Sequence, residues 1–340
     1  MSDQPKRPGP NAPPTRPTRE PTRPTREPTR QPTRQPRSKP KPLGVFTPVP
    51  LSTPLASRDL TPDERERQRR VSMAPEDRLW VYLSDNTGVK VPEDQNYFFE
   101  SRLRRIIMTS DSKDLNGLVN SILRPGVEAE ELRNQVVDAL MTHETSFFRN
   151  PEVFEKLETE IIPDLLKLVT PPSELRIWSA ASSTGQEAIS TSILMQEVAP
   201  HRPYSILGSD IGVGTVNKAS TGKYSVLETN RGLSASRLHQ WFAKEGVAFK
   251  VHPTIRRSIT YRVHNLLEPL TGYLPFHLVM LRNVLVYFDE QSRQQAFKHI
   301  ARVTMPGSVV VLGTGEQLLN VPDQLFTRHV DRRVAWLRRK

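Results

Sequence analysis

The chain has 340 residues, enough for about two domains, and its 48 basic and 37 acidic residues give a formal net charge of +11. It contains no cysteine, which excludes a disulfide framework, a thiolate nucleophile, Cys-ligated zinc and an iron–sulfur cluster. No apolar run approaches the ~20 residues that a membrane span requires, and the N-terminus lacks the apolar stretch of a signal peptide. We therefore expect a soluble, cytoplasmic protein.

Residues 1–70 have the composition of a disordered tail. Eleven basic and three acidic residues fall within 1–41, so eight of the eleven net positive charges lie there. Sixteen of the 31 prolines precede residue 55, and the triplet Pro-Thr-Arg occurs six times in that stretch. Dense proline removes backbone donors and fixes φ, and few apolar residues are present to be buried. Two interpretations of the tail stay open: a spacer, or a tether for an anionic partner such as an acidic protein, lipid headgroups or nucleic acid.

Residues 71–142 have the pattern of a small all-helical domain. Pro75 followed by two acidic residues is typical of a first helical turn. Further helices are predicted over 93–109, 113–123 and 128–141.

A linker and one more helix are predicted over 143–172. The helix follows Asn150-Pro151, and Pro163 is expected to kink or end it, because proline cannot donate the helical hydrogen bond.

From residue 173 to residue 340, apolar strands alternate with helices. Strands are predicted over 175–181, 204–210, 276–281, 308–312 and 334–337. Helices are predicted over 184–198, 212–220, 234–244 and 290–304. This alternation predicts an open, mainly parallel α/β sheet. Ala248–Val251 and Ile255–Val263 are expected to form an inserted hairpin around His252-Pro253.

Two features mark the carboxyl ends of these strands, where open parallel sheets bind ligands. Small residues run from Ser179 to Glu187, which lets backbone and a helix N-terminus approach a ligand closely. Asp210 ends the second strand, where an acid can accept hydrogen bonds from ribose hydroxyls. A tight turn and a helix N-cap are the structural alternatives for these two features. The G-x-G-x-x-G fingerprint of dinucleotide sites is absent.

Asparagines follow two further strands, at Asn265 and Asn283. A side-chain amide donates and accepts at once, which suits an adenine edge or an amino-acid headgroup, although asparagine is also a common turn residue. The eight histidines form no H-x-x-x-H pair, so no metal site is predicted.

Seven motifs occur in order and together resemble the chemoreceptor glutamate methyltransferases, the CheR family, over about residues 75–340. They are Thr145-Ser-Phe-Phe-Arg149, Ile177-Trp-Ser-Ala-Ala-Ser-Ser-Thr-Gly-Gln-Glu187, Gly208-Ser-Asp-Ile211, Ala219-x-x-Gly222-x-Tyr224, Asn265-Leu-Leu267, Arg282-Asn-Val-Leu-Val-Tyr-Phe288 and Gly313-x-x-Glu316.

The resemblance implies a Rossmann-like domain that binds S-adenosylmethionine, yields S-adenosylhomocysteine and carries a small antiparallel β-subdomain at about 245–263. It implies a monomer that methylates glutamate side chains on the cytoplasmic domain of a chemoreceptor, with Arg102 and Arg105 facing that substrate. It also implies cofactor contacts at His143, Thr145, Arg149, Ala181, Glu187, Asp210, Asn265, Leu266, Asn283 and Val284.

The chemistry that follows from the resemblance requires no general base. A glutamate carboxylate, with a pKa of ~4.3, is already ionised at pH 7. An arginine can orient it through two parallel hydrogen bonds, and we expect Arg149 to do so, with Tyr287 as a second partner.

The chain departs from the family pattern at several positions. Ala188-Ile189 stand where Pro-Tyr is usual, Gly212 replaces the second acid of Asp-Ile-Asp, and His143 stands where Asn is frequent. These departures keep two alternatives open. One is a non-catalytic, cofactor-binding adaptor that regulates a chemosensory array, and the other is an interaction protein that acts through its basic tail.

Overall fold

The computed structural model describes residues 73–90 and 96–340, apart from the side chains of residues 96–98 and 100. The prediction of a disordered tail over 1–70 lies outside the described residues.

Within the described residues up to 142, the chain forms four helices. They are α2 (Pro75–Thr87), α3 (Asn96–Thr109), α4 (Leu115–Ile122) and α5 (Val127–Leu140). Proline and two acids occupy the first turn of α2, where an absent N–H and negative charge are both tolerated. Asp114 caps α4 by accepting a 2.7 Å hydrogen bond from the Gly117 amide. One apolar cluster joins these helices, including Leu79, Leu83, Leu103, Leu118 and Val136.

The helix after Asn150-Pro151 continues past the position where Pro163 was expected to kink or end it. It consists of α6 (Pro151–Lys156), a π-helical turn η1 (Leu157–Ile161) and α7 (Ile162–Leu168). The Ile162 amide donates to the Leu157 carbonyl five residues earlier. The wider turn places Pro163 at the start of α7, where its missing N–H costs no regular helical bond. The interruption therefore takes the form of a π-helical turn.

Seven strands form the main sheet in the order β6-β2-β1-β7-β8-β10-β9. They are β1 (Leu175–Ala180), β2 (Tyr204–Asp210), β6 (Ile259–Val263), β7 (Phe276–Leu281), β8 (Thr304–Leu312), β9 (Phe326–Asp331) and β10 (Val334–Arg339). The pairs from β6 to β8 are parallel, and β10 is antiparallel to both of its neighbours. The sheet thus confirms the predicted, mainly parallel α/β fold.

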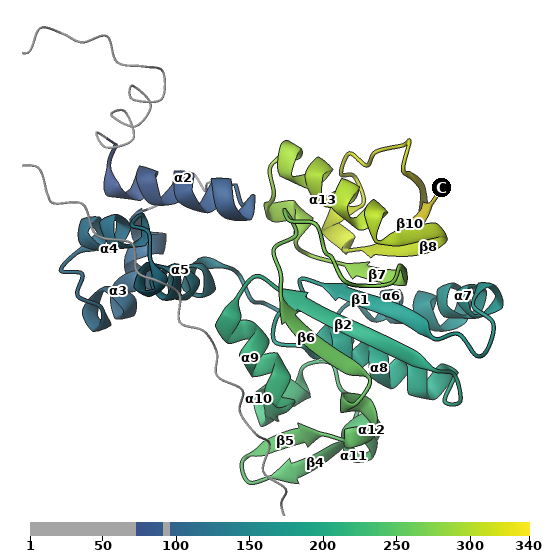
Figure 1. Ribbon diagram of the computed structural model, residues 1–340. Helices are drawn as coiled ribbons and strands as arrows, with labels where there is room; N and C mark the ends of the chain where they lie inside the picture. The colour runs from purple at the N-terminus through teal and green to yellow at the C-terminus, as the bar shows by residue number, and fades with distance from the viewer. Residues whose placement is uncertain (1–72, 91–95) are drawn as a thin grey trace, which may run out of the picture. The chain divides into compact units, whose positions relative to one another are not determined.

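Helices cover both faces of this sheet, as Figure 1 shows for α8 (Gln186–Val198) and α13 (Glu290–Arg302). Alternate strand residues enter two separate cores, because successive side chains of a strand point to opposite faces. Ile177 packs in the core that includes α8, whereas its neighbour Trp178 packs in the core that includes α13. All six residues of β7 are buried, which explains why five of the six are apolar.

The predicted hairpin around His252-Pro253 is wrong. β5 (Ala248–Val251) lies in a small antiparallel sheet between β3 (Lys223–Ser225) and β4 (Phe242–Glu245), whereas β6 pairs with β2 in the main sheet. His252 caps the short helix α12 (Pro253–Arg256) that connects them. The small sheet therefore spans 223–251 and not about 245–263. Buried Ile255 and Ile259 explain the difference, because they pack in the core of the main sheet.

Three strands, β3, β4 and β9, were not anticipated by the sequence pattern. The helix predicted over 234–244 ends as α11 (Ala235–Trp241), and its last residues begin β4. β9 has only its first residue, Phe326, fully buried, so it lacks the apolar run by which the other strands were predicted. All three are edge strands, whose exposed residues carry little hydrophobic pattern.

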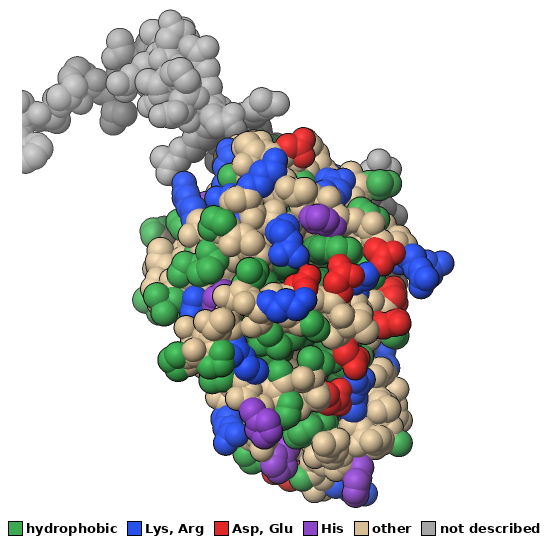
Figure 2. All heavy atoms as spheres, turned by 90° about the vertical axis from the view of Figure 1, so that its right-hand side faces the viewer, with side chains coloured by type: hydrophobic (Ala, Val, Ile, Leu, Met, Phe, Trp, Pro, Cys, Tyr) green, Lys and Arg blue, Asp and Glu red, His purple; other side chains and the backbone are tan. Residues whose placement is uncertain are grey.

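The surface of the folded part carries mixed charge. Figure 2 shows acidic side chains gathered in a band with basic side chains around them, on the face that includes α7. Glu155, Glu158 and Glu160 are exposed on the helix leading into α7, and Lys156 pairs with both Glu160 and Asp331. None of the helices described over 73–90 and 96–340 combines the length and the apolar character that a membrane crossing requires.

Candidate functional site

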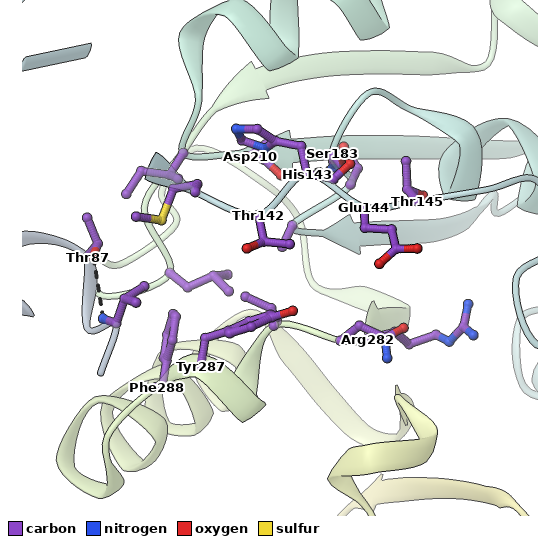
Figure 3. Close-up of a pocket in the computed structure, with 18 of the residues that line it drawn as sticks. Thr87, Thr142, His143, Glu144, Thr145, Ser183, Asp210, Arg282, Tyr287 and Phe288 are labelled. Atoms are coloured by element: carbon purple, nitrogen blue, oxygen red, sulfur yellow. Dashed lines mark hydrogen bonds between the residues drawn. The ribbon is translucent and has the colours of Figure 1, made fainter. Parts of the chain in front are cut away.

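A pocket lies at the carboxyl ends of the parallel strands. The loops that follow β1, β2, β6 and β7 line it, together with the segment 140–149 and the end of α2. Figure 3 shows Asp210, Ser183 and His143 on one side of this pocket, with Tyr287 and Phe288 across from them. We call it the carboxyl-end pocket.

Asp210 is a buried carboxylate at the end of β2. Its two oxygens accept hydrogen bonds from the backbone amides of Ser183, at 2.8 Å, and Gly212, at 3.1 Å. Burial raises the pKa of Asp210 above the ordinary range of an aspartate, while these two amides oppose that rise. Each oxygen keeps a further lone pair, so Asp210 can still accept hydrogen bonds from a ligand hydroxyl.

The loop after β1 contains two non-glycine residues with left-handed backbone, Ala181 at φ 61° and Ser183 at φ 51°. Such conformations cost about 1–3 kcal/mol each and persist only where the surrounding structure holds them. The Ser183 amide is held by Asp210, and the Ser182 amide donates to the Ser209 carbonyl at 2.8 Å. The turn therefore presents backbone directly to the pocket.

Glu187, in the first turn of α8, forms a buried ion pair with Arg282. The Arg282 Nη1 lies 3.0 Å from one Glu187 oxygen, and the Ser179 hydroxyl donates to the other at 2.8 Å. Burial raises the pKa of Glu187, and the adjacent Arg282 partly opposes this. The second terminal nitrogen of Arg282 donates to the Arg149 carbonyl and to the Asn150 side chain. Arg282 therefore fixes both Glu187 and the loop that carries Arg149.

Glu316 fixes the loop after β7. This fully buried carboxylate accepts four backbone hydrogen bonds, from the amides of Gly313, Asn283, Val284 and Leu285, at 2.7–2.9 Å. Asn283 has a left-handed backbone, at φ 60°. The four bonds stabilise this conformation and place Asn283 and Val284 at the pocket wall.

Residues 142–149 cross the pocket and carry three of the predicted contacts. The His143 ring lies against the Asp138 carbonyl and the Thr215 hydroxyl, and its own carbonyl accepts from Ser183. Within the described residues, the guanidinium of half-buried Arg149 donates to one acceptor, the Glu144 carbonyl, at 2.7 Å. Its remaining N–H groups stay available at the pocket wall.

Asn265 lines the pocket, but its side chain has protein partners. Its oxygen accepts from the Leu267 amide at 3.0 Å, and its nitrogen donates to the Asn86 carbonyl at 2.6 Å. The side chain thus forms the turn that was considered as the alternative for this residue, and it also ties the turn to α2.

All the predicted cofactor contacts line the carboxyl-end pocket, and Tyr287 lines it too. Arg102 and Arg105 do not: both are exposed on α3, and Arg102 donates to the Ala139 and Met141 carbonyls at the end of α5. Their contact with a substrate stays a prediction.

Several lining residues escaped the sequence analysis. Helix α2 contributes Trp80 and Thr87, and the residues after it contribute Val89 and Lys90. Backbone pairing holds the end of α2 in place, because the Lys90 amide donates to the Tyr287 carbonyl at 2.7 Å. No sequence pattern links α2 to residues 200 positions away. Arg282 offered a better signal, since an arginine directly after an apolar strand is an unusual residue to bury.

Across the described residues, no three His, Asp or Glu side chains converge as a metal site would require.

Comparisons with known proteins agree on one family. The family model described as "CheR methyltransferase, SAM binding domain" matches residues 143–334. The chain is 33% identical over 250 residues to "Chemotaxis protein methyltransferase 1" of Pseudomonas aeruginosa, covering 72% of this chain and 90% of that protein. It is 34% identical over 250 residues to "Chemotaxis protein methyltransferase Cher2" of Pseudomonas putida, with the same coverage. It is 29% identical over 249 residues to "Chemotaxis protein methyltransferase 1" of Vibrio cholerae, covering 72% and 89%.

Proposed function

This chain belongs to the CheR methyltransferase family, and from that premise we propose that it methylates glutamate side chains on the cytoplasmic helix of a chemoreceptor, forming glutamate methyl esters. The observation that carries the proposal is the half-buried Arg149 guanidinium, which lines the same pocket as Asp210 and the Glu187–Arg282 pair.

The chemical character of the pocket fits S-adenosylmethionine, which supplies a methyl group on a positively charged sulfur. The Asp210 carboxylate would accept hydrogen bonds from the ribose hydroxyls. Leu266, Ile211 and Phe288 provide apolar walls for a flat base. Glu187 places a carboxylate where a cationic ligand needs one, although Arg282 already neutralises part of its charge.

The substrate carboxylate is itself the nucleophile. It is ionised at pH 7, so the protein has no proton to remove and has only to orient the attacking oxygen and exclude water. Arg149 is suited to this because its free N–H groups can bind both carboxylate oxygens side by side. The bond between sulfur and methyl breaks as the bond between oxygen and methyl forms, and the sulfur keeps the electron pair.

Tyr287 is the second residue to which we assign an orienting role. Its side chain lines the pocket and is 43% exposed, so its hydroxyl can reach both the pocket and solvent. A phenol hydroxyl can donate one hydrogen bond to a carboxylate oxygen and so help to hold the substrate in place.

Transfer of a labelled methyl group tests the proposal. The full chain is incubated with methyl-labelled S-adenosylmethionine and chemoreceptor cytoplasmic fragments from the same organism. We expect label on the receptor that alkali releases as methanol, because a methyl ester is base-labile. Label that resists alkali would contradict esterification, and cofactor binding without any transfer would favour the adaptor.

The first prediction concerns Arg149. We expect Arg149→Ala to lower kcat/KM about 100-fold, because a misaligned nucleophile costs rate even when the cofactor is bound. Arg257→Ala removes an exposed arginine outside the pocket and serves as the matched control. Near-normal turnover of Arg149→Ala would rule out the orienting role.

A further inference from the structure

Helix α9 (Val213–Thr221) begins at a residue that cannot cap it. Its N-cap is Gly212, which has no side chain to accept hydrogen bonds from the first turn. The acceptor comes from another helix: the Asp138 carboxylate, near the end of α5, accepts from the Gly214 amide at 2.6 Å. The other Asp138 oxygen accepts from the Thr215 hydroxyl at 3.2 Å and from the Thr215 amide at 3.4 Å. α5 therefore supplies the cap of α9.

Space, and not backbone conformation, requires glycine at position 212. Its φ of −78° is open to any residue. A Cβ atom there, however, would lie 2.2 Å from an Asp138 oxygen and 2.9 Å from the Thr215 hydroxyl. The Asp138 carboxylate thus occupies the volume that a side chain at 212 would fill.

The same turn holds Asp210. The Gly212 amide donates to one Asp210 oxygen and the Ser183 amide to the other. His143 forms a second link between Asp138 and this part of the pocket. Its ring contacts the Asp138 carbonyl at 2.9 Å, and its own carbonyl accepts a hydrogen bond from the Ser183 hydroxyl at 3.1 Å. Figure 3 shows His143, Ser183 and Asp210 side by side at the pocket. Asp138 therefore contacts the segment after this turn directly, through Gly214 and Thr215, and reaches Ser183 through His143.

We propose that Asp138 is a positioning residue for cofactor binding: its carboxylate takes the place of the side chain missing at Gly212 and sets the Gly212 turn that holds Asp210. Cofactor affinity then depends on the packing of α5 against α9. By linkage, the bound cofactor strengthens that packing in return. The inference rests on the proposed function only in taking S-adenosylhomocysteine, the reaction product, as the ligand.

Variants that move the carboxylate from position 138 to position 212 test this inference. Calorimetric titration of the full chain with S-adenosylhomocysteine compares wild type, Asp138→Ala, Gly212→Asp and the double variant. We expect Asp138→Ala to weaken binding about 10-fold. Gly212→Asp should weaken it at least as much, because two carboxylates would then compete for one site. The double variant should return to within about threefold of wild type, since Asp is a good N-cap at position 212.

Asp114→Ala is the matched control, because it removes the cap of α4 away from the pocket. It should lower Tm while leaving the dissociation constant unchanged. Asp138→Ala should raise KM for S-adenosylmethionine more than it lowers kcat, which a general loss of stability would not do. An Asp138→Ala affinity within twofold of wild type, or a double variant no better than Gly212→Asp, would overturn the inference.

The titration separates this inference from the proposed function, because it involves no receptor. Rescue of binding in the double variant, together with no methyl transfer by wild type, would support the role of Asp138 and contradict glutamate methylation.

Discussion

The two ends of the parallel strands are built differently. Six described non-glycine residues have positive φ, and five of them lie in loops that line the carboxyl-end pocket: Phe148, Asn150, Ala181, Ser183 and Asn283. Buried carboxylates fix these loops, with Asp210 and Glu316 together accepting six backbone amides. The carboxyl ends of the strands therefore contain strained backbone and buried charge, and many hydrogen bonds are needed to stabilise both.

The amino ends of the same strands carry ordinary turns. The Phe276 amide donates to the Val303 carbonyl, and the Arg176 guanidinium donates to the Pro275 carbonyl at 2.7 Å. A buried neutral histidine, His277, accepts from the Arg176 amide at 2.9 Å. The difference teaches that polar groups at the amino ends serve stability, whereas those at the carboxyl ends position ligand-binding loops. Three substitutions test this division.

Glu316→Gln should have the largest effect. The side-chain nitrogen of glutamine cannot accept a hydrogen bond. Two of the four backbone N–H groups would then face this NH2 group and remain buried without an acceptor. We expect S-adenosylhomocysteine binding to weaken at least 100-fold, as measured by calorimetry, and Tm to fall. Exposed Glu290→Gln is the control. Unchanged affinity in a folded Glu316→Gln sample would show that the loop after β7 does not contribute to the site.

Asp210→Asn should weaken cofactor binding by ~1.5–3 kcal/mol, the range for hydrogen bonds to a charged group, or about 10- to 150-fold. The wild type should also bind more weakly as the pH falls, because protonation removes the negative charge and turns one acceptor oxygen of Asp210 into a donor. Since burial raises the pKa of Asp210, this loss begins at a higher pH than for an ordinary aspartate.

Titrations at a series of pH values between 8 and 5 would measure this dependence. Asp210→Asn should show a flatter profile than wild type, because it has no carboxyl proton to gain. Parallel profiles for the two proteins would assign the dependence to another group.

His277→Gln should have the smallest effect and act on stability alone. Burial lowers the pKa of His277 to about 4, against about 6.5 in the unfolded chain. The unfolded chain therefore binds more protons between these values, so the stability that His277 contributes is complete above pH 6.5 and falls as the pH drops towards 4. We expect wild type to lose about 1–2 kcal/mol more than the variant between pH 7 and pH 5 in urea unfolding.

Exposed His239→Gln provides the comparison for that measurement. If His277→Gln weakened cofactor binding, polar groups at the amino ends of the parallel strands would affect ligand binding as well as stability.

Much of the molecule was determined by the sequence alone. Buried strands such as β1, β2 and β7 are rich in apolar residues because both faces of the sheet are covered. Asp210 ends β2, and Asn265 and Asn283 lie two residues after β6 and β7, so their meeting at one edge follows from parallel pairing. Local pattern is sufficient where a segment is buried on both sides or lies next to one that is.

Tertiary structure alone decided the remainder. β5 and β6 have similar short apolar patterns, yet they pair with different sheets, because Ile255 and Ile259 find their partners in the main core. The capping of α9 by Asp138 joins residues 76 positions apart, and Lys90, just after α2, pairs with Tyr287, 197 positions away. These contacts depend on how distant segments fit together and on polar groups there that still need a hydrogen-bond partner. No local periodicity of the sequence encodes either.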